Sequence, residues 1–298
     1  MKLICPNQSL FSIQIKENLK KKFKCDFFDI SQNKFDNIIG NYDIVLCRFS
    51  KNINFFNNHK IKFILSPTTG LNHIDKKYFN DKKVKIITLK NSYNFLKKIN
   101  ASSELTVLLI LNFQRKINKI FQTKKKIIGK EINGKKIGII GYGRIGKKVG
   151  KILKSFGAEI FFYDKKKIKG RKTLEFILKN SDIISIHIPL EEANINFLNQ
   201  NRLNKIKKNT LIVNTSRGEV INENYLINKL KNKELSYATD VVSGENFNQS
   251  KRFLKLKFDN LLITPHIGGL TEESIHKTDM YIYKKFIREY EKKIHLHC

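Results

Sequence analysis

The sequence predicts an α/β protein of two domains, each built on a parallel sheet. Short apolar runs alternate with amphipathic helical stretches along the whole chain, which is typical of parallel α/β architecture. At 298 residues the chain is long enough for two domains of ordinary size. A glycine-rich turn follows one apolar run near the middle of the chain, which indicates that one of the two domains binds a nucleotide.

The expected elements follow from the spacing of the apolar residues. In the first part of the chain we expect strands at 3–5, 25–28, 44–47, 63–65 and 84–88, with a helix at 11–22. A long helix with a broad apolar face is expected at 103–121. Later strands are expected at 137–140, 160–163, 183–188, 210–214, 237–240 and 261–264, and a closing helix at 271–291.

The glycine turn has the features of a dinucleotide-binding fingerprint. It reads Gly141-Tyr142-Gly143-Arg144-Ile145-Gly146 and stands between an apolar run and a helical pattern. The first glycine allows the tight turn, the second lets the backbone approach a pyrophosphate, and the third lets helix and strand pack closely. The N–H groups at the helix start, at Arg144 and Ile145, are expected to face the phosphates.

Asp164 ends the next apolar run, 18 residues beyond Gly146, where a carboxylate is expected to bind the ribose hydroxyls of the adenosine. A carboxylate repels a 2′-phosphate, so NAD is the expected cofactor and NADP is disfavoured, although Lys165, Lys166 and Lys167 weaken that preference. The sequence therefore predicts a Rossmann NAD-binding domain at 101–271. The flanking segments, 1–100 and 272–298, would together form the other domain.

The formal charge of +32 invites a nucleic-acid interpretation, but the composition argues against it. Only 8 of the 58 basic residues are Arg, the better bidentate reader of phosphate, and the Lys residues are spread along the whole chain with abundant Asn, Ile and Phe. A nucleotide-composition bias explains this pattern, so no nucleic acid is expected as a partner. The charge is compatible with drawing in a small anionic substrate.

Membrane, metal and secreted classes are also disfavoured. The apolar stretches are too short to span a bilayer, and the first ten residues lack the apolar segment of a secretory signal. The four cysteines have no paired spacing, which favours reduced thiols and a cytoplasmic location. The segment from His295 to Cys298 resembles a metal-binding fragment, but a frayed terminus is the preferred interpretation, and no metal site is expected.

Polar clusters follow the expected strands of the nucleotide domain, at the strand ends where ligands of open parallel sheets bind. They begin at His187, Asn214, Asp240 and Thr264, and a further cluster, 66–75, follows a strand of the first domain. In sequence they read His187-Ile188-Pro189-Leu190, Asn214-Thr215-Ser216-Arg217-Gly218, the segment 240–245 and Thr264-Pro265-His266-Ile267-Gly268-Gly269.

These clusters resemble the D-isomer-specific 2-hydroxyacid dehydrogenase family, which includes D-3-phosphoglycerate dehydrogenases, glyoxylate/hydroxypyruvate reductases and D-lactate dehydrogenases. The resemblance covers about 132–270, the 66–75 loop, and the helix start at 101–105, where Glu104-Leu105 stands in the family's Ala-Glu-Leu position. Order and spacing agree, with 28 residues from Arg217 to Glu245 and 21 from Glu245 to His266. The resemblance implies NAD-linked interconversion of a D-2-hydroxy acid and a 2-oxo acid. It also implies that the Rossmann domain is inserted into a flavodoxin-like substrate domain made of 1–100 plus 272–298.

The resemblance also implies a catalytic set of Arg217, Glu245 and His266. An imidazole titrates nearest neutral pH, so His266 is the expected general acid/base for the carbonyl oxygen. Glu245 would hydrogen-bond the other ring nitrogen and fix its orientation. Arg217 would clamp the substrate carboxylate and polarise the carbonyl, a task that suits a rigid, permanently charged fork.

The remaining candidate residues take binding roles by the same resemblance. Asp240 lies near the nicotinamide ring in that family, and His187 is expected to shape the cofactor groove. The backbone N–H groups of Thr69, Gly70, Leu71 and Asn72 are expected to hold the substrate carboxylate. Arg48 stands where relatives place a substrate-facing cation, with a solvated surface role as the equal alternative. Further cofactor contacts are expected at Pro189, Thr215, Ser216, Gly268 and Gly269.

Some residues depart from the family pattern, and other functions remain open. Asn246 follows Glu245 where the family usually has Pro, Glu191 stands where Thr is frequent, and no Trp is present. Formate dehydrogenases share the fold but place Gln at the position of Glu245. Transcriptional co-repressors on the same fold keep the cofactor site, so an NAD(H)-sensing protein without turnover is the alternative function. A homodimer is expected, as in relatives, with the nicotinamide in a cleft between the domains.

Overall fold

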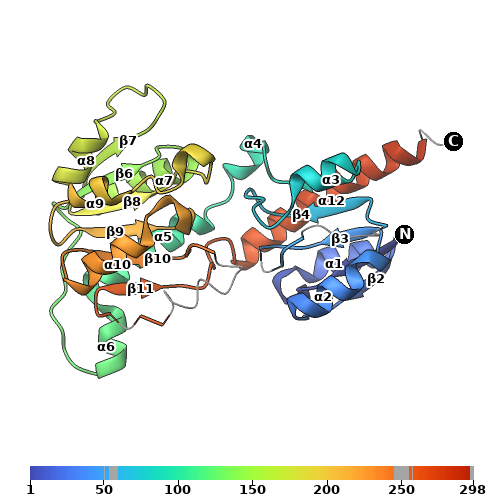
Figure 1. Ribbon diagram of the computed structural model, residues 1–298, viewed down its shortest axis with the longest axis horizontal. Helices are drawn as coiled ribbons and strands as arrows, with labels where there is room; N and C mark the ends of the chain where they lie inside the picture. The colour runs from blue at the N-terminus through green and yellow to red at the C-terminus, as the bar shows by residue number, and fades with distance from the viewer. Residues whose placement is uncertain (50, 54–59, 245–254, 257, 296–298) are drawn as a thin grey trace. The chain divides into compact units, whose positions relative to one another are not determined.

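The computed structural model describes residues 1–298 except 50, 54–59, 245–254, 257 and 296–298. The chain divides into two compact units (Figure 1). Unit 1 consists of Met1–Ile99 and Leu270–Cys298, and unit 2 of Asn100–Gly269. Both units alternate strands with helices, so the chain enters unit 1, forms all of unit 2, and returns to unit 1.

Unit 1 holds a five-stranded parallel sheet in the order β2-β1-β3-β4-β5. This is the flavodoxin-like strand order. Its strands are β1 (Lys2–Cys5), β2 (Lys24–Phe27), β3 (Ile44–Leu46), β4 (Phe63–Ser66) and β5 (Lys85–Thr88). Its helices are α1 (Ile13–Lys20), α2 (Gln32–Ile38), α3 (Lys76–Asp81), α4 (Tyr93–Leu96) and α12 (Glu272–His295), with 3-10 turns η1 (Gln8–Leu10) and η2 (Ile39–Asn41).

Alternating side chains along the strands of unit 1 fill two cores, one on each face of the sheet. Leu3 packs with α1 and with Ile282 and Phe286 of α12. Its neighbour Ile4 packs in a different cluster with Phe35 of α2. Because successive strand residues point to opposite faces, the sheet is buried on both sides, as a parallel sheet requires. Helix α12, from the end of the chain, therefore completes a core that the first residues begin.

Unit 2 holds a six-stranded parallel sheet in the order β11-β10-β9-β8-β6-β7. Its strands are β6 (Lys136–Ile140), β7 (Glu159–Tyr163), β8 (Ile183–Ile186), β9 (Leu211–Asn214), β10 (Ser236–Thr239) and β11 (Leu261–Ile263). Its helices are α5 (Ala101–Arg115), α6 (Ile117–Thr123), α7 (Arg144–Ser155), α8 (Leu174–Asn180), α9 (Gln200–Asn204) and α10 (Glu223–Lys231), with 3-10 turns η3 (Glu192–Asn194) and η4 (Gly218–Val220).

The strand order of unit 2 reverses at β6, whose two neighbours are β7 and β8. From β6 the chain adds β7 on one side of the sheet and β8 to β11 on the other side. This reversal of strand order leaves a crevice for ligands at the carboxyl ends of the strands. The predicted fold class, a Rossmann domain with a flavodoxin-like partner, is confirmed. None of the helices in the described part of the chain has the length and apolar character needed to cross a bilayer.

One expected helix differs from the helix in the structure. The helix predicted at 103–121 is two helices, because Lys116 takes a left-handed conformation with φ 55° and separates α5 from α6. The side chain of Asn112 accepts a hydrogen bond from the backbone N–H of Asn118 across the break, at 3.3 Å. Apolar periodicity continues through such a break, so the pattern alone did not reveal it.

Candidate functional site

The glycine turn lies directly after β6, at the point where the strand order reverses. Gly141 has φ 93°, and a Cβ there would lie 2.8 Å from the backbone of His187. A Cβ on Gly146, inside α7, would lie 2.2 Å from the carbonyl oxygen of Gly141. Neither position accepts a side chain without moving backbone, so both glycines are required by the packing of the turn.

Gly143 differs from its neighbours because it faces open space. A Cβ there would meet no atom within 4 Å, and its φ of −84° is accessible to other residues. It is the residue before α7, and it offers no capping side chain to the N–H groups of that twelve-residue helix. A pyrophosphate needs free space next to backbone N–H groups that no side chain caps. The start of α7 offers both, so the turn fits the dinucleotide expected from the sequence.

Asp164 follows β7 and contacts the glycine turn directly. Its Oδ2 accepts a hydrogen bond from the backbone N–H of Tyr142 at 2.8 Å, and its Oδ1 accepts one from Lys166 at 2.9 Å. Arg171 donates to the backbone carbonyl of Asp164 at 3.0 Å. The carboxylate thus lies beside the fingerprint turn, within the same unit, and its predicted contact with a ribose remains a prediction.

His187 follows β8 and is neutral. Its Nε2 lies 2.8 Å from the hydroxyl of Ser185. Burial of the imidazole among protein atoms lowers the pKa of His187 to about 3, so it carries no charge near neutral pH. An imidazole that stays neutral near neutral pH is poorly suited to proton transfer, and the role of His187 in shaping the groove remains a prediction.

The loop after β9 is fixed by side-chain hydrogen bonds. Asn214 accepts from the backbone N–H and the hydroxyl of Ser216, at 3.0 and 2.8 Å, and donates to the carbonyl of Arg217 at 2.8 Å. The hydroxyl of Thr215 lies 2.8 Å from that of Thr106 on α5. These bonds hold the backbone that carries Arg217 in one conformation.

Gly218 brings this loop against the segment that follows β10. A Cβ at Gly218 would lie 2.0 Å from the backbone nitrogen of Ser243 and 2.1 Å from the carbonyl carbon of Val242. The two loops touch through backbone, and only glycine permits this approach. Arg217 is thus held next to the segment that leads toward Glu245, which itself lies outside the described residues.

Asp240, at the end of β10, holds the turn that carries His266. Its buried carboxylate accepts hydrogen bonds from the hydroxyl of Thr264 at 2.6 Å and from the backbone N–H groups of Ile267 and Gly268 at 2.8 and 2.7 Å. Burial raises the pKa of Asp240, and these hydrogen bonds oppose the rise. Sequence reasoning expected this residue near the nicotinamide; in the structure its carboxylate binds the neighbouring turn.

The His266 turn has an unusual backbone. The N–H of His266 donates to the carbonyl of Thr264 at 3.0 Å, which closes a three-residue turn around Pro265. His266 itself has φ 55°, a left-handed conformation that residues with a side chain rarely adopt. Such conformations persist only where surrounding bonds impose them, and the bonds to Asp240 do so here. Gly268 is buried against the same carboxylate, and Gly269 is exposed.

In unit 1, the loop after β4 is supported by a buried polar network. The hydroxyl of Ser66 lies 2.9 Å from that of Thr68 and 3.1 Å from Nε2 of His73. Thr68 donates to the carbonyl of Gly70 at 2.9 Å. Ser66 and His73 have no exposed surface. We name residues 67–72, which include the predicted carboxylate contacts at Thr69, Gly70, Leu71 and Asn72, the substrate loop.

Arg48, just after β3, is buried, and the solvated alternative for this residue is therefore wrong. Only 7% of it is exposed, because its guanidinium pairs with Asp279 of α12 at 2.6 Å. Burial lowers the pKa of Arg48 and raises that of Asp279, and in both groups the charge of the partner opposes the shift. Sequence reasoning missed Asp279; its only signal is an acid on the face of a helix that also carries the buried Ile282 and Phe286.

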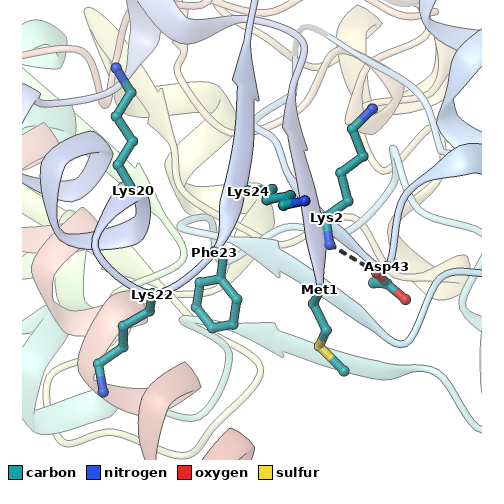
Figure 2. Close-up of a pocket in the computed structure, with 7 residues that line it drawn as sticks. All are labelled: Met1, Lys2, Lys20, Lys22, Phe23, Lys24 and Asp43. Atoms are coloured by element: carbon teal, nitrogen blue, oxygen red, sulfur yellow. Dashed lines mark hydrogen bonds between the residues drawn. The ribbon is translucent and has the colours of Figure 1, made fainter.

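None of these residues lines the hollow of unit 1 that Figure 2 shows. It is lined by Met1, Lys2, Lys20, Lys22, Phe23, Lys24 and Asp43. These residues flank the amino ends of β1, β2 and β3, whereas ligands of open parallel sheets bind at the carboxyl ends. The hollow is therefore not part of the candidate site.

Comparison with known proteins agrees with the geometry. Residues 108–268 match the family described as "D-isomer specific 2-hydroxyacid dehydrogenase, NAD binding domain". A hydroxypyruvate reductase from Thermotoga maritima is 31% identical over 242 residues, which are 77% of this chain and 78% of the relative. The chain belongs to the D-isomer specific 2-hydroxyacid dehydrogenase family. A D-3-phosphoglycerate dehydrogenase from Haemophilus influenzae is 34% identical over 167 residues, which are 53% of this chain and only 41% of that relative.

Solved structures show the same fold over the whole chain. The apo D-lactate dehydrogenase from Escherichia coli has a TM-score of 0.83 at 23% identity and covers 98% of each chain. A D-lactate dehydrogenase from Aquifex aeolicus, complexed with NAD and lactic acid, has a TM-score of 0.76 at 20% identity and covers 99% of this chain and 97% of its own. The predicted family, the oxidoreductase class and the NAD(H) cofactor are confirmed. Individual residue roles and the substrate remain predictions.

Proposed function

We propose that this protein interconverts a small D-2-hydroxy acid and the corresponding 2-oxo acid, with His266 as the general acid/base. The observation that carries the proposal is the arrangement within unit 2. The glycine turn, the Arg217 loop and the His266 turn follow β6, β9 and β11 of one parallel sheet, at the edge where ligands bind. NADH, when bound, supplies a hydride from C4 of its nicotinamide ring.

Each residue of the set has a distinct task in this proposal. Arg217 binds the substrate carboxylate with its planar fork and polarises the neighbouring carbonyl. His266 donates a proton to the carbonyl oxygen during reduction and accepts it back during oxidation. Glu245 hydrogen-bonds the other ring nitrogen of His266 and fixes the orientation of the ring. In unit 1, the task proposed for the N–H groups of the substrate loop is to bind a carboxylate group.

Asp240 supports this chemistry through the backbone. It fixes the turn from Thr264 to Gly268 with three hydrogen bonds, and so limits the positions that the His266 ring can reach. A proton donor contributes only when it is held within hydrogen-bonding distance of the reacting oxygen. Asp240 is therefore a positioning residue in this proposal.

The cofactor preference and the assembly extend the proposal. Asp164 at the glycine turn disfavours the additional phosphate of NADP. Among the described residues of unit 2, four large apolar side chains are more than half exposed, including Ile195 at 54%. The other three lie in the segment 108–128, Leu108 at 57%, Phe121 at 68% and Ile128 at 90%, which supports a homodimer formed through this segment. Cys5, Cys25 and Cys47 are free thiols, in keeping with the expected cytoplasmic location.

A panel of 2-oxo acids tests the function. Purified protein is mixed with NADH and glyoxylate, hydroxypyruvate, pyruvate or phosphohydroxypyruvate, and the loss of NADH absorbance is followed. We expect steady turnover with at least one acid, and its loss in Arg217→Ala and His266→Ala. Binding of NADH without turnover of any acid would instead favour the NAD(H)-sensing alternative. Repeating the assay with NADPH tests the cofactor preference.

A further inference from the structure

The buried ion pair of unit 1 joins segments that are far apart in the sequence. Arg48 and Asp279 are 231 residues apart, and their side chains are 8% and 0% exposed. The same guanidinium nitrogen, Nη2, donates to the hydroxyl of Thr278 at 3.1 Å and to Oδ1 of Asp279 at 2.6 Å. The other oxygen of Asp279 accepts a hydrogen bond from the backbone N–H of Ser12 at 2.8 Å.

The remaining donors of Arg48 reach two backbone carbonyls. Nε donates to Leu10 at 3.0 Å, and Nη1 donates to Pro67 at 3.3 Å. The guanidinium also lies over the ring of Phe11, 5.0 Å from its centroid. One side chain therefore connects the end of β3, the segment before α1, helix α12 and the first residue of the substrate loop.

The cost of burying two charges indicates that the pair does more than stabilise the unit. Replacing a buried ion pair by apolar residues of similar volume is often neutral or stabilising, because desolvation offsets much of the attraction. An apolar pair would fill this space, but it would not bind the carbonyl of Pro67. The hydrogen bonds to the carbonyls of Leu10 and Pro67 thus require the fork of an arginine, and the bond to Pro67 is the one that reaches the substrate loop.

We propose that Arg48 and Asp279 are a positioning pair that fixes the substrate loop. Asp279 orients the guanidinium, and the guanidinium holds the backbone at Pro67, so the N–H groups of Thr69 to Asn72 keep the spacing that a carboxylate requires. The proposal rests on the proposed function, since it assumes that this loop binds the substrate carboxylate. It differs from the expectation of a substrate-facing cation, because Arg48 acts here through the loop backbone.

Three variants separate positioning from stability. Arg48→Lys keeps the charge but lacks the fork, Asp279→Asn removes the charge that orients Arg48, and Arg48→Met with Asp279→Leu replaces the pair by apolar side chains. Glu289→Gln is the control, because Glu289 of α12 pairs with Lys85 of β5 at 2.9 Å on the surface of the same unit. Each variant is assayed for melting temperature, NADH affinity, and KM and kcat for the 2-oxo acid that the wild type reduces.

We expect the KM for the 2-oxo acid to rise about tenfold or more in Arg48→Lys and in the double variant, because small misplacements of binding groups are costly. The dissociation constant of NADH should stay within about twofold, since the glycine turn belongs to unit 2 and is not altered. The double variant should keep a melting temperature near that of the wild type and still show the raised KM. Glu289→Gln should change neither quantity.

Amide hydrogen exchange gives a readout that does not need turnover. The N–H groups of residues 68–73 should exchange faster in Arg48→Lys and in the double variant than in the wild type and in Glu289→Gln. Unchanged exchange, or a double variant with wild-type KM, would overturn the positioning role. If the wild type reduces no 2-oxo acid, the proposed function fails, and the exchange rates still decide whether the pair holds the loop.

Discussion

Both units hold a loop in place at the end of a strand, but they use different interactions to do so. In unit 2 the loops are fixed by neighbours and by glycines: Asp240 binds the turn of His266, and Gly218 lets two loops touch. In unit 1 the substrate loop is held by Arg48, whose partner Asp279 comes from the far end of the chain. A site built from turn residues leaves a sequence signature, and one built from a distant pair leaves almost none.

The largest effect should come from the turn of unit 2. His266→Gln keeps a hydrogen-bonding side chain but removes the titratable group, and we expect kcat/KM to fall about 10³-fold, within the range of general acid–base catalysis. The affinity for NADH, measured by fluorescence titration, should be unchanged. A variant that keeps more than about a tenth of the wild-type rate would show that another group supplies the proton.

The glycine turn offers a matched pair of substitutions. In Gly146→Ala the new Cβ meets the carbonyl oxygen of Gly141, so the free energy of unfolding should fall by about 1–3 kcal/mol. Gly143→Ala meets no protein atom, so its stability should stay within about 0.5 kcal/mol of the wild type.

The same pair should separate packing from binding. The methyl group in Gly143→Ala enters the space expected for the pyrophosphate, so NADH affinity should fall about tenfold. Thermal unfolding and NADH titration check both variants. Normal NADH binding by Gly143→Ala would place the cofactor elsewhere.

Ser66→Ala tests the support of the loop in unit 1. It removes a buried hydroxyl that lies within hydrogen-bonding distance of both Thr68 and His73, so we expect a loss of about 1–3 kcal/mol in unfolding free energy. The KM for the 2-oxo acid should rise a few-fold while kcat changes little. Ser155→Ala, an exposed serine in α7, is the control and should be neutral. Equal effects of the two substitutions would show that the buried hydroxyl of Ser66 does not support the loop.

At neutral pH His187 should give the smallest effect, and its main consequence should be a change in how stability depends on pH. Its folded pKa of about 3 lies below the ordinary value of 6.5, so the unfolded state binds more protons between these values. The stability contributed by the neutral imidazole is complete above pH 6.5 and is lost as the pH falls toward 3.

The variant His187→Gln lacks this titration. Between pH 8 and pH 5 we expect the wild type to lose about 2 kcal/mol more than the variant, from 1.36 kcal/mol per pH unit. Denaturant unfolding at the two pH values measures the difference. Parallel losses in both proteins would mean that the imidazole is protonated as readily in the folded state as in the unfolded state.

The sequence predicted most of what depends on local chemistry. The glycines at 141, 143 and 146, the acid at 164 and the strand ends of unit 2 follow from spacing and residue type, and the fold class follows from the alternation of elements. The left-handed residue at Lys116 was not foreseen, because any residue type can adopt it under tertiary constraint. The partners of Arg48 were missed for a different reason, since no local pattern connects residues 48 and 279.

The division of unit 1 between the two ends of the chain affects the order of folding. During synthesis, residues 1–99 appear before α12, and one face of their sheet is covered only in part, by α1, until α12 supplies Ile282 and Phe286. Unit 2 is continuous and contains all of its own strands, so it is complete before that helix exists. The nascent chain therefore carries a finished cofactor domain and an unfinished one, whose partly covered sheet face exposes apolar side chains to aggregation and to chaperones.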